Sequence, residues 1–148
     1  MTEVLDQASR PICLMPAAEA ARLSLPHKAA ALLISDNKNR KILRLNSKNE
    51  FGFVAEGFIP AGESVEDYIR QLTPDWARGE PEPLFVVPAS AGTRFARLYV
   101  YQARCSCCPA DDALLPLHKN EYEALLSRGY AFCPVFNFVA RTANLNWI

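Results

Sequence analysis

Acidic side chains crowd the middle of this chain. Five carboxylates fall within one short stretch, at Glu56, Glu63, Glu66, Asp67 and Asp75. Clustered carboxylate oxygens bind hard cations such as Mg²⁺ and Mn²⁺, and a bound cation of this kind neutralises charge during phosphoryl chemistry. We therefore consider this stretch a candidate metal-assisted site. The alternative is structural, because acids near the start of a helix often serve as a solvated face or as a cap.

A second group of residues with metal-ligand chemistry is the run Cys105-Ser106-Cys107-Cys108. Thiolates bind Zn²⁺ and Cu(I), so the three cysteines of this run are candidate zinc ligands, but a structural zinc needs four ligands in a tetrahedron. His118 or Cys133 completes such a site only if the fold brings one of them close. The alternative is a loop of free thiols that oxidise easily.

The overall composition favours a soluble protein of the cytosol. Half of the 148 residues are hydrophobic, and 16 basic side chains balance 16 acidic ones, so we expect one domain over residues 1–148 and no general nucleic-acid binding. No apolar run approaches the roughly 18 residues of a membrane span, and residues 1–10 lack the apolar core of a secretory signal. Five cysteines without such a signal are expected to be reduced thiols.

The order of apolar and turn-forming segments predicts strands interleaved with a few helices, which indicates an α/β or α+β fold. Residues 1–26 are expected to be an irregular lead-in with a short helical piece near Ala17–Leu23. Lys28–Ser35 and Lys41–Leu45 flank the turn Asp36-Asn-Lys-Asn39, which predicts a hairpin. The other expected elements are a strand at 51–55, a stiff linker at 79–83, strands at 84–87 and 95–102, a helix at 120–128 capped by Asn120, and a helical tail within 134–148 that completes a C-terminal helical segment, 120–148.

The clearest helix signal follows Gly57. Ser64 is a good N-cap residue, and the next apolar residues recur with the spacing of one helix face, at Val65, Tyr68, Ile69 and Leu72. Thr73-Pro74 predicts the end of this helix, since proline lacks an N–H and constrains the residue before it. The helix therefore carries Glu66 and Asp67 in its first turn.

The stretch from Gly57 to Trp76 resembles the Nudix box, whose pattern is G-x5-E-x7-R-E-U-x-E-E-x-G-U, with U a bulky aliphatic residue. Gly57 and Glu63 have the spacing of the first two box residues, and the turn Pro60-Ala-Gly-Glu-Ser64 is also typical. Leu25-Pro-His-Lys-Ala29 is similar to the segment before the first strand in the isopentenyl-diphosphate-isomerase-like branch of that superfamily. The resemblance spans residues 25–102 and implies an α/β/α sandwich around a mixed β-sheet.

In that family the glutamates of R-E-U-x-E-E hold Mg²⁺ or a related cation against a diphosphate. The same positions here contain one carboxylate, Asp75, whether the box is aligned without a gap or with one residue deleted. Pro74 also interrupts the helix where the ligands have to align. The resemblance leaves Glu63 and Asp75 as candidate ligands for Mg²⁺ or Mn²⁺, and it leaves as candidate catalytic acids Glu63, Glu66, Asp67 and Asp75.

The resemblance also implies a site for a phosphorylated substrate. The residues that we expect to contact it are His27, Arg44, Lys48 and Glu56. Asn46 and Ser47 stand where the family usually has arginines. For His27 the structural alternative is a histidine at a strand edge that makes fixed hydrogen bonds.

Three functions stay open on the sequence alone. The first is a Nudix-superfamily protein without the standard pyrophosphohydrolase site, which binds a small phosphorylated molecule or a protein. The second is a hydrolase of nucleoside-diphosphate-type substrates with a rebuilt acid cluster and bound Mg²⁺ or Mn²⁺. The third is a metal-binding or redox-sensing domain that uses the 105–108 loop. An exposed sheet edge is a candidate surface for a homodimer.

Overall fold

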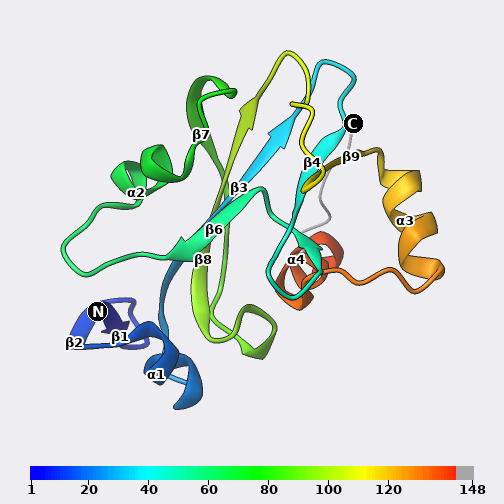
Figure 1. The fold of residues 1–148 in the computed structure, drawn as a ribbon. Helices are drawn as coiled ribbons and strands as arrows, with labels where there is room; N and C mark the ends of the chain where they lie inside the picture. The colour runs from blue at the N-terminus through cyan, green and yellow to red at the C-terminus, as the bar shows by residue number, and fades with distance from the viewer. Residues whose placement is uncertain (143–148) are drawn as a thin grey trace.

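Strand β3 (His27–Ser35) runs through the middle of the protein and is buried along almost its whole length (Figure 1). Its sequence is nearly continuous in apolar residues, as expected for a strand that is covered on both faces. It pairs in parallel with β8 (Ala96–Arg104) on one edge and with two antiparallel strands on the other. The rest of the sheet is built outward from this strand.

The structure is a computed structural model that describes residues 1–142. Its main sheet has seven strands in the order β5-β4-β3-β8-β7, and β6 additionally pairs with β3 and β9 with β4. The other elements of the chain are β1 (Thr2–Leu5), β2 (Pro11–Met15), α1 (Ala17–Arg22), β4 (Lys41–Leu45), β5 (Phe51–Gly52), β6 (Ala55–Phe58), α2 (Val65–Leu72), β7 (Arg78–Val87), the 3-10 turn η1 (Ala91–Thr93), β9 (Leu114–Leu117), α3 (Lys119–Ser127) and α4 (Pro134–Thr142).

Helices cover both faces of the sheet, with α2 on one side and α3 and α4 on the other (Figure 1). Alternate residues of β3 supply the two core layers, because successive side chains of a strand point to opposite faces. Ala29, Ala31 and Leu33 pack in the layer that holds α3 and α4. Residues 30, 32 and 34 pack in the layer with Ile69 of α2. The predicted α/β sandwich around a mixed sheet is therefore confirmed.

The prediction of an irregular lead-in over residues 1–26 was wrong. This segment forms the antiparallel hairpin β1–β2 and then helix α1, which was the only element predicted there. Strand β1 is tied to the body of the protein, since Leu5 N donates to Pro26 O at 2.7 Å and Thr2 Oγ1 donates to Ile59 O at 2.9 Å. The prolines that suggested irregular structure lie at the start of β2 and between the elements.

Other boundaries also differ from the predictions. The expected linker at 79–83 is part of the long edge strand β7, which accommodates its prolines through two register shifts. The expected strand at 51–55 is divided into β5 and β6, and β9 was not predicted. Helix α3 begins at Lys119 after the cap residue His118, so Asn120 is not its cap. The helical tail is confirmed as α4, and the predicted part at 143–148 lies outside the described residues.

Three tight turns share one design. In the turns Asp6–Arg10, Asp36–Arg40 and Asn46–Glu50, the Oδ1 atom of the first residue accepts the N–H groups two and four residues later, at 2.9 to 3.0 Å. The fourth residue of each turn has a positive φ, which serine and asparagine tolerate. The predicted 36–39 turn is confirmed.

Among residues 1–142, no helix has the length and apolar character that crossing a bilayer requires.

The Asp36 turn differs from the others in its depth. The Asp36 side chain is fully buried, and its Oδ2 accepts from Arg40 Nε at 2.8 Å. Burial opposes ionisation of this carboxyl, but the N–H groups of Arg40 and Lys38 and the Arg40 guanidinium outweigh burial and hold its pKa below the usual value. The ionised carboxylate thus stabilises the fold.

We expect Asp36→Ala to lower the free energy of unfolding by about 3 kcal/mol, because it leaves buried donors without an acceptor. The matched change Asp6→Ala, in a turn whose arginine is largely exposed, is expected to cost less than about 1 kcal/mol. Urea denaturation at neutral pH measures both. Since the folded pKa of Asp36 is lowered, its contribution is present above the unfolded pKa and is lost as the pH falls through the folded value. Equal losses of unfolding free energy in Asp36→Ala and Asp6→Ala would contradict the special stabilising role of the buried Asp36 carboxylate.

Candidate functional site

The Nudix-like segment forms a strand, a turn and a helix, which are β6, residues 59–64 and α2. Ser64 Oγ accepts the N–H of Asp67 at 3.1 Å, which confirms the predicted N-cap. Ile69 is completely buried against the sheet. The helix ends at Leu72, directly before Thr73-Pro74, as the sequence predicted. Local signals therefore fixed this part of the fold correctly.

Gly57 is required by the packing between β6 and α2. A Cβ atom on this residue would lie 2.0 Å from Tyr68 Oη, far inside van der Waals contact. The phenol of Tyr68 thus occupies the space of the missing side chain. The box glycine has a structural reason in this chain that is independent of any chemistry.

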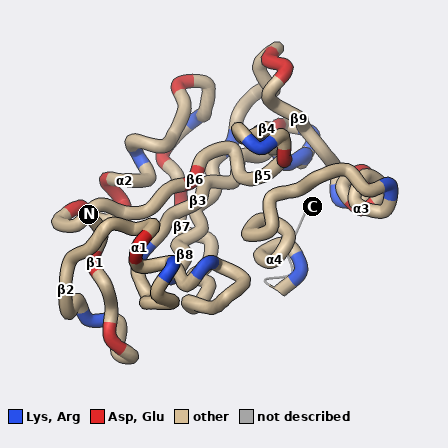
Figure 2. Tube along the Cα trace, turned by 60° about the horizontal axis from the view of Figure 1, so that its bottom comes forward, with Lys and Arg blue, Asp and Glu red and all other residues tan. Residues whose placement is uncertain are grey.

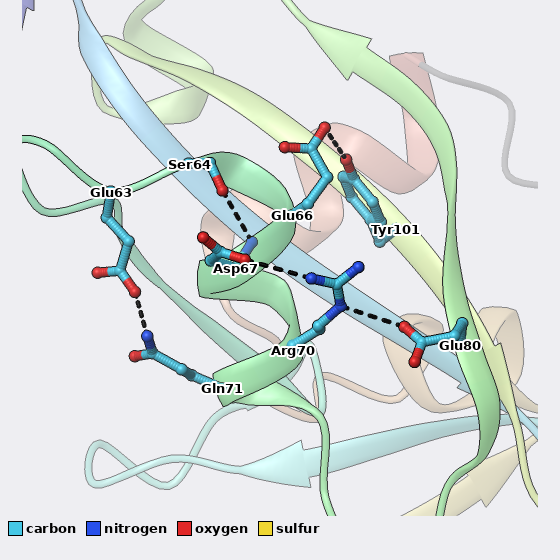
Figure 3. Close-up of polar contacts among 8 residues, drawn as sticks. All are labelled: Glu63, Ser64, Glu66, Asp67, Arg70, Gln71, Glu80 and Tyr101. Carbon is cyan, nitrogen blue, oxygen red and sulfur yellow. Dashed lines mark hydrogen bonds and ion pairs between the residues drawn. The ribbon is translucent and has the colours of Figure 1, made fainter.

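The acids of the α2 region are engaged with neighbouring side chains (Figure 3). Glu63 accepts a hydrogen bond from the amide of Gln71, and Glu66 Oε1 lies 3.5 Å from Tyr101 Oη. Asp67 and Glu80 both bind Arg70, each at 3.2 Å. Figure 3 shows Glu63, Glu66 and Asp67 directed toward three different partners, and Glu80 of β7 sharing Arg70 with Asp67.

Asp75 is separated from these acids because the helix ends three residues before it. It is exposed and lies in the turn that leads to β7. Within residues 1–142, no three His, Cys, Asp or Glu side chains come together in a group that could hold a metal ion. The sequence motif therefore does not assemble its acids at one point.

Two of the four residues expected to bind substrate are engaged elsewhere. Arg44 Nε donates to the carbonyl oxygen of Val54 at 3.1 Å, which ties β4 to the segment before β6. His27 is fully buried, its Nδ1 lies 2.9 Å from Leu25 O, and its ring packs 5.1 Å from that of Phe58. Its Nε2 is buried and has no hydrogen-bond partner in the described part of the chain. The contact of Nδ1 with Leu25 O agrees with the structural alternative for His27, a histidine that makes fixed hydrogen bonds at a strand edge.

The other two, Lys48 and Glu56, line a cavity of about 560 Å³ on the α4 side of the sheet. Its walls come from the first half of β3, from β6, from the Asn46–Glu50 turn, from the loop before β8 and from the start of α4. The apolar part of the lining includes Phe58, Leu98 and Val135. This size and mixed lining are typical of small-molecule sites, which span about 300–1,000 Å³.

Three charged side chains in the cavity wall lack protein partners. Lys48, Glu56 and Arg94 form no side-chain hydrogen bond or ion pair with another residue of the 1–142 range, and all three line the cavity. Glu56 is exposed on the cavity wall, yet desolvation by nearby protein atoms raises the pKa of its carboxyl, which the positive charge of Arg94 partly offsets. The cavity thus presents the cations Lys48 and Arg94 and two carboxyl groups, which are Glu56 with its raised pKa and Glu50, which accepts a hydrogen bond from Asn46 Nδ2 at 3.3 Å.

Arg94 was missed in the sequence because a single arginine in a loop has no diagnostic spacing. It follows η1, and both Arg94 and Phe95 have positive φ values, of 55° and 63°. Such backbone strain in consecutive non-glycine residues is concentrated at functional sites. Gly92 lies in the same loop, and a Cβ atom there would be 2.3 Å from the ring of Phe138. Helix α4 therefore packs directly on the loop that carries Arg94.

The cysteine run lies at the opposite end of β8. Cys105 is buried, and burial together with the charge of Asp36 raises the pKa of its thiol to about 11. Burial also raises the pKa of the half-buried Cys108, whereas Cys107 is exposed. His118 precedes α3 and Cys133 lines the cavity, and neither joins the 105–108 run in a metal-binding group of the described chain.

Comparison with known proteins gives the fold alone. No family model and no curated protein matches the sequence. The structure is similar to the 1.9 Å crystal structure of DR0079 from Deinococcus radiodurans, with a TM-score of 0.72 and 14% sequence identity. The match covers 89% of this chain and 91% of that one. The shared fold therefore extends well beyond the Nudix-like segment.

We expect Gly57→Ala to lower the free energy of unfolding by about 1–3 kcal/mol, because the new methyl group collides with Tyr68. The second variant, Tyr68→Phe, removes the hydroxyl that causes the collision. A double-mutant cycle by chemical denaturation measures the coupling between the two changes. Gly57→Ala is expected to cost less in the Tyr68→Phe background, and equal costs in both backgrounds would exclude this contact as the cause.

The raised pKa of Glu56 gives a prediction for pH. A carboxyl whose folded pKa is raised stabilises the protein below its unfolded pKa, and this contribution is lost as the pH rises through the folded value. We therefore expect Glu56→Gln to gain thermal stability relative to the wild type as the pH rises from acid to neutral. Melting temperatures across this range test it, with the exposed Glu123→Gln as the control for net charge. If the melting temperatures of wild type and Glu56→Gln changed with pH in parallel, the raised pKa of Glu56 would be refuted.

Proposed function

We propose that this chain is a Nudix-superfamily protein without the standard metal-dependent pyrophosphohydrolase site, and that it binds a small phosphorylated molecule in the cavity beside Gly57. One observation carries the proposal. Charged side chains without protein partners line the cavity, whereas Glu63 before α2 and Glu66 and Asp67 on α2 are engaged with Gln71, Tyr101 and Arg70. The groups available to a ligand are therefore in the cavity.

The chemistry of the lining supports a phosphorylated ligand. Lys48 and Arg94 supply positive charge, and charge-assisted hydrogen bonds to phosphate oxygens are among the stronger polar contacts. Desolvation raises the pKa of the Glu56 carboxyl, which lowers the ionised fraction of this group at a given pH and lessens its repulsion of an anion. Phe58 and Leu98 offer an apolar wall for the rest of the molecule.

The hydrolase alternative has less support from the geometry. It requires Glu63, Glu66, Asp67 and Asp75 to share a cation such as Mg²⁺ or Mn²⁺. The first three acids are bound to separate partners around α2, and Asp75 lies beyond the end of the helix. A metal-dependent reaction would need these contacts to break and the chain after Leu72 to move.

The deciding experiment is calorimetric titration of nucleoside diphosphate compounds into thiol-reduced protein, with and without Mg²⁺ or Mn²⁺. We expect saturable binding in the absence of metal, with no hydrolysis product in a parallel chromatographic assay. Binding and turnover that both require metal, and that disappear in Asp75→Ala, would establish the hydrolase instead.

Paired variants locate the ligand in the cavity. Lys48 and Lys38 occupy the same position in two turns of the same design, but only Lys48 lines the cavity. We expect Lys48→Ala to weaken binding about tenfold, the loss of one charge-assisted contact, and Lys38→Ala to leave it unchanged. Arg94→Asn removes the second cation, and asparagine tolerates the positive φ of this position. Equal effects of Lys38→Ala and Lys48→Ala would place the ligand elsewhere.

A further inference from the structure

The N-terminal hairpin leaves one strand edge open. Strands β1 and β2 form a two-stranded sheet separate from the main sheet. Strand β1 and the residue before it are bonded to the body of the protein, since Leu5 N donates to Pro26 O at 2.7 Å and Ala61 N donates to Met1 O at 2.9 Å. Strand β2 pairs with β1 alone, and no other described residue bonds to the backbone of residues 11–15. Alternate N–H and C=O groups of β2 therefore face away from the molecule without partners.

The side chains of this open strand are apolar and exposed. Its sequence is Pro-Ile-Cys-Leu-Met, and Figure 2 shows it without charge between the charged hairpin turn and α1. Ile12 is 62% exposed and Leu14 is 57% exposed. Four of the seven large hydrophobic residues that are exposed in residues 1–142 lie between positions 1 and 23. Exposed apolar surface concentrated in this way marks an interaction site.

Other edges of the protein are protected against strand pairing, and β2 is not. Edge strand β7 contains Pro81 and Pro83, two acids and two register shifts, all of which hinder the addition of another strand. Strand β9 carries Pro116 in its middle. The proline of β2 is its first residue, Pro11, where it removes only a terminal N–H. The β2 edge is therefore suited to receive a strand.

We propose that the strand received by β2 is β2 of a second copy of this chain. Pairing about a two-fold axis is antiparallel, and the register that keeps all five residues paired places Cys13 opposite Cys13. Ile12 of each copy then faces Leu14 of the other, so each exposed side chain is covered by an equivalent apolar one. The strand is therefore complementary to itself. Because the formal net charge of the chain is zero, two copies do not repel each other through their overall charge.

The resulting dimer is a continuous four-stranded sheet of β1, β2 and their two copies. One short strand edge and its apolar side chains bury less than the about 1,600 Å² of a standard interface. The dimer is therefore weak and concentration-dependent. None of the residues that line the cavity lies in β1 or β2, so this inference does not depend on the proposed function.

Sedimentation velocity over a wide concentration range tests the proposal. We expect the wild type to shift from monomer to dimer, and Leu14→Lys to raise the dissociation constant by at least about tenfold, since it places a charge opposite Ile12 of the other copy. The matched control is Val86→Lys on β7, a residue that is also exposed and apolar. It is expected to dimerise like the wild type. Circular dichroism confirms that each variant is folded.

Cross-linking tests the register. In a Cys107→Ser/Cys108→Ser background, Cys13 is the remaining exposed thiol of the described residues, since Cys105 and Cys133 are buried. A short bismaleimide is expected to link two copies through Cys13, and Cys13→Ser abolishes the linked product. A wild type that stays monomeric at every concentration overturns the proposal, as does a dimer that Leu14→Lys leaves intact. A dimer without the Cys13 link overturns the register.

Discussion

Parallel pairing between β3 and β8 holds the molecule together. The two strands are in register from His27 opposite Ala96 to Ser35 opposite Arg104, and β3 carries β6 and β4 on its other edge. The residue sizes along β3 also determine where space remains. Its first half is Ala29-Ala-Ala31 and its second half is Leu32-Leu-Ile34. The cavity lies over the alanine half, where small side chains leave room between the sheet and α4.

Three residues of the segment that resembles the Nudix box have architectural roles. Gly57 admits Tyr68, Ser64 caps α2, and Pro74 follows the point at which α2 ends. The turn and helix signals of this segment therefore serve to join strand β6 to helix α2 whether or not the segment binds a metal.

Local signals in the sequence were sufficient for several elements. The hairpin around Asp36 and helix α2 were predicted because a turn motif, a cap and a proline stop each act within a few residues. The strand predicted at 84–87 is the end of β7, but the first part of β7 was missed because its prolines resemble a linker and its pairing with β8 depends on residues distant in sequence. In the candidate site, Lys48 and Glu56 were identified, but Arg94 reaches the cavity only through a loop conformation that single-residue types do not reveal.

The contact between Gly92 and Phe138 has a consequence for recognition. Because the aromatic ring fills the space that a side chain on residue 92 would need, the loop carrying Arg94 is wedged against α4 before any ligand arrives. A rim held by close packing has little conformational freedom left to lose on association. Under the proposed function, the main entropic cost of binding would therefore be the immobilisation of the ligand itself.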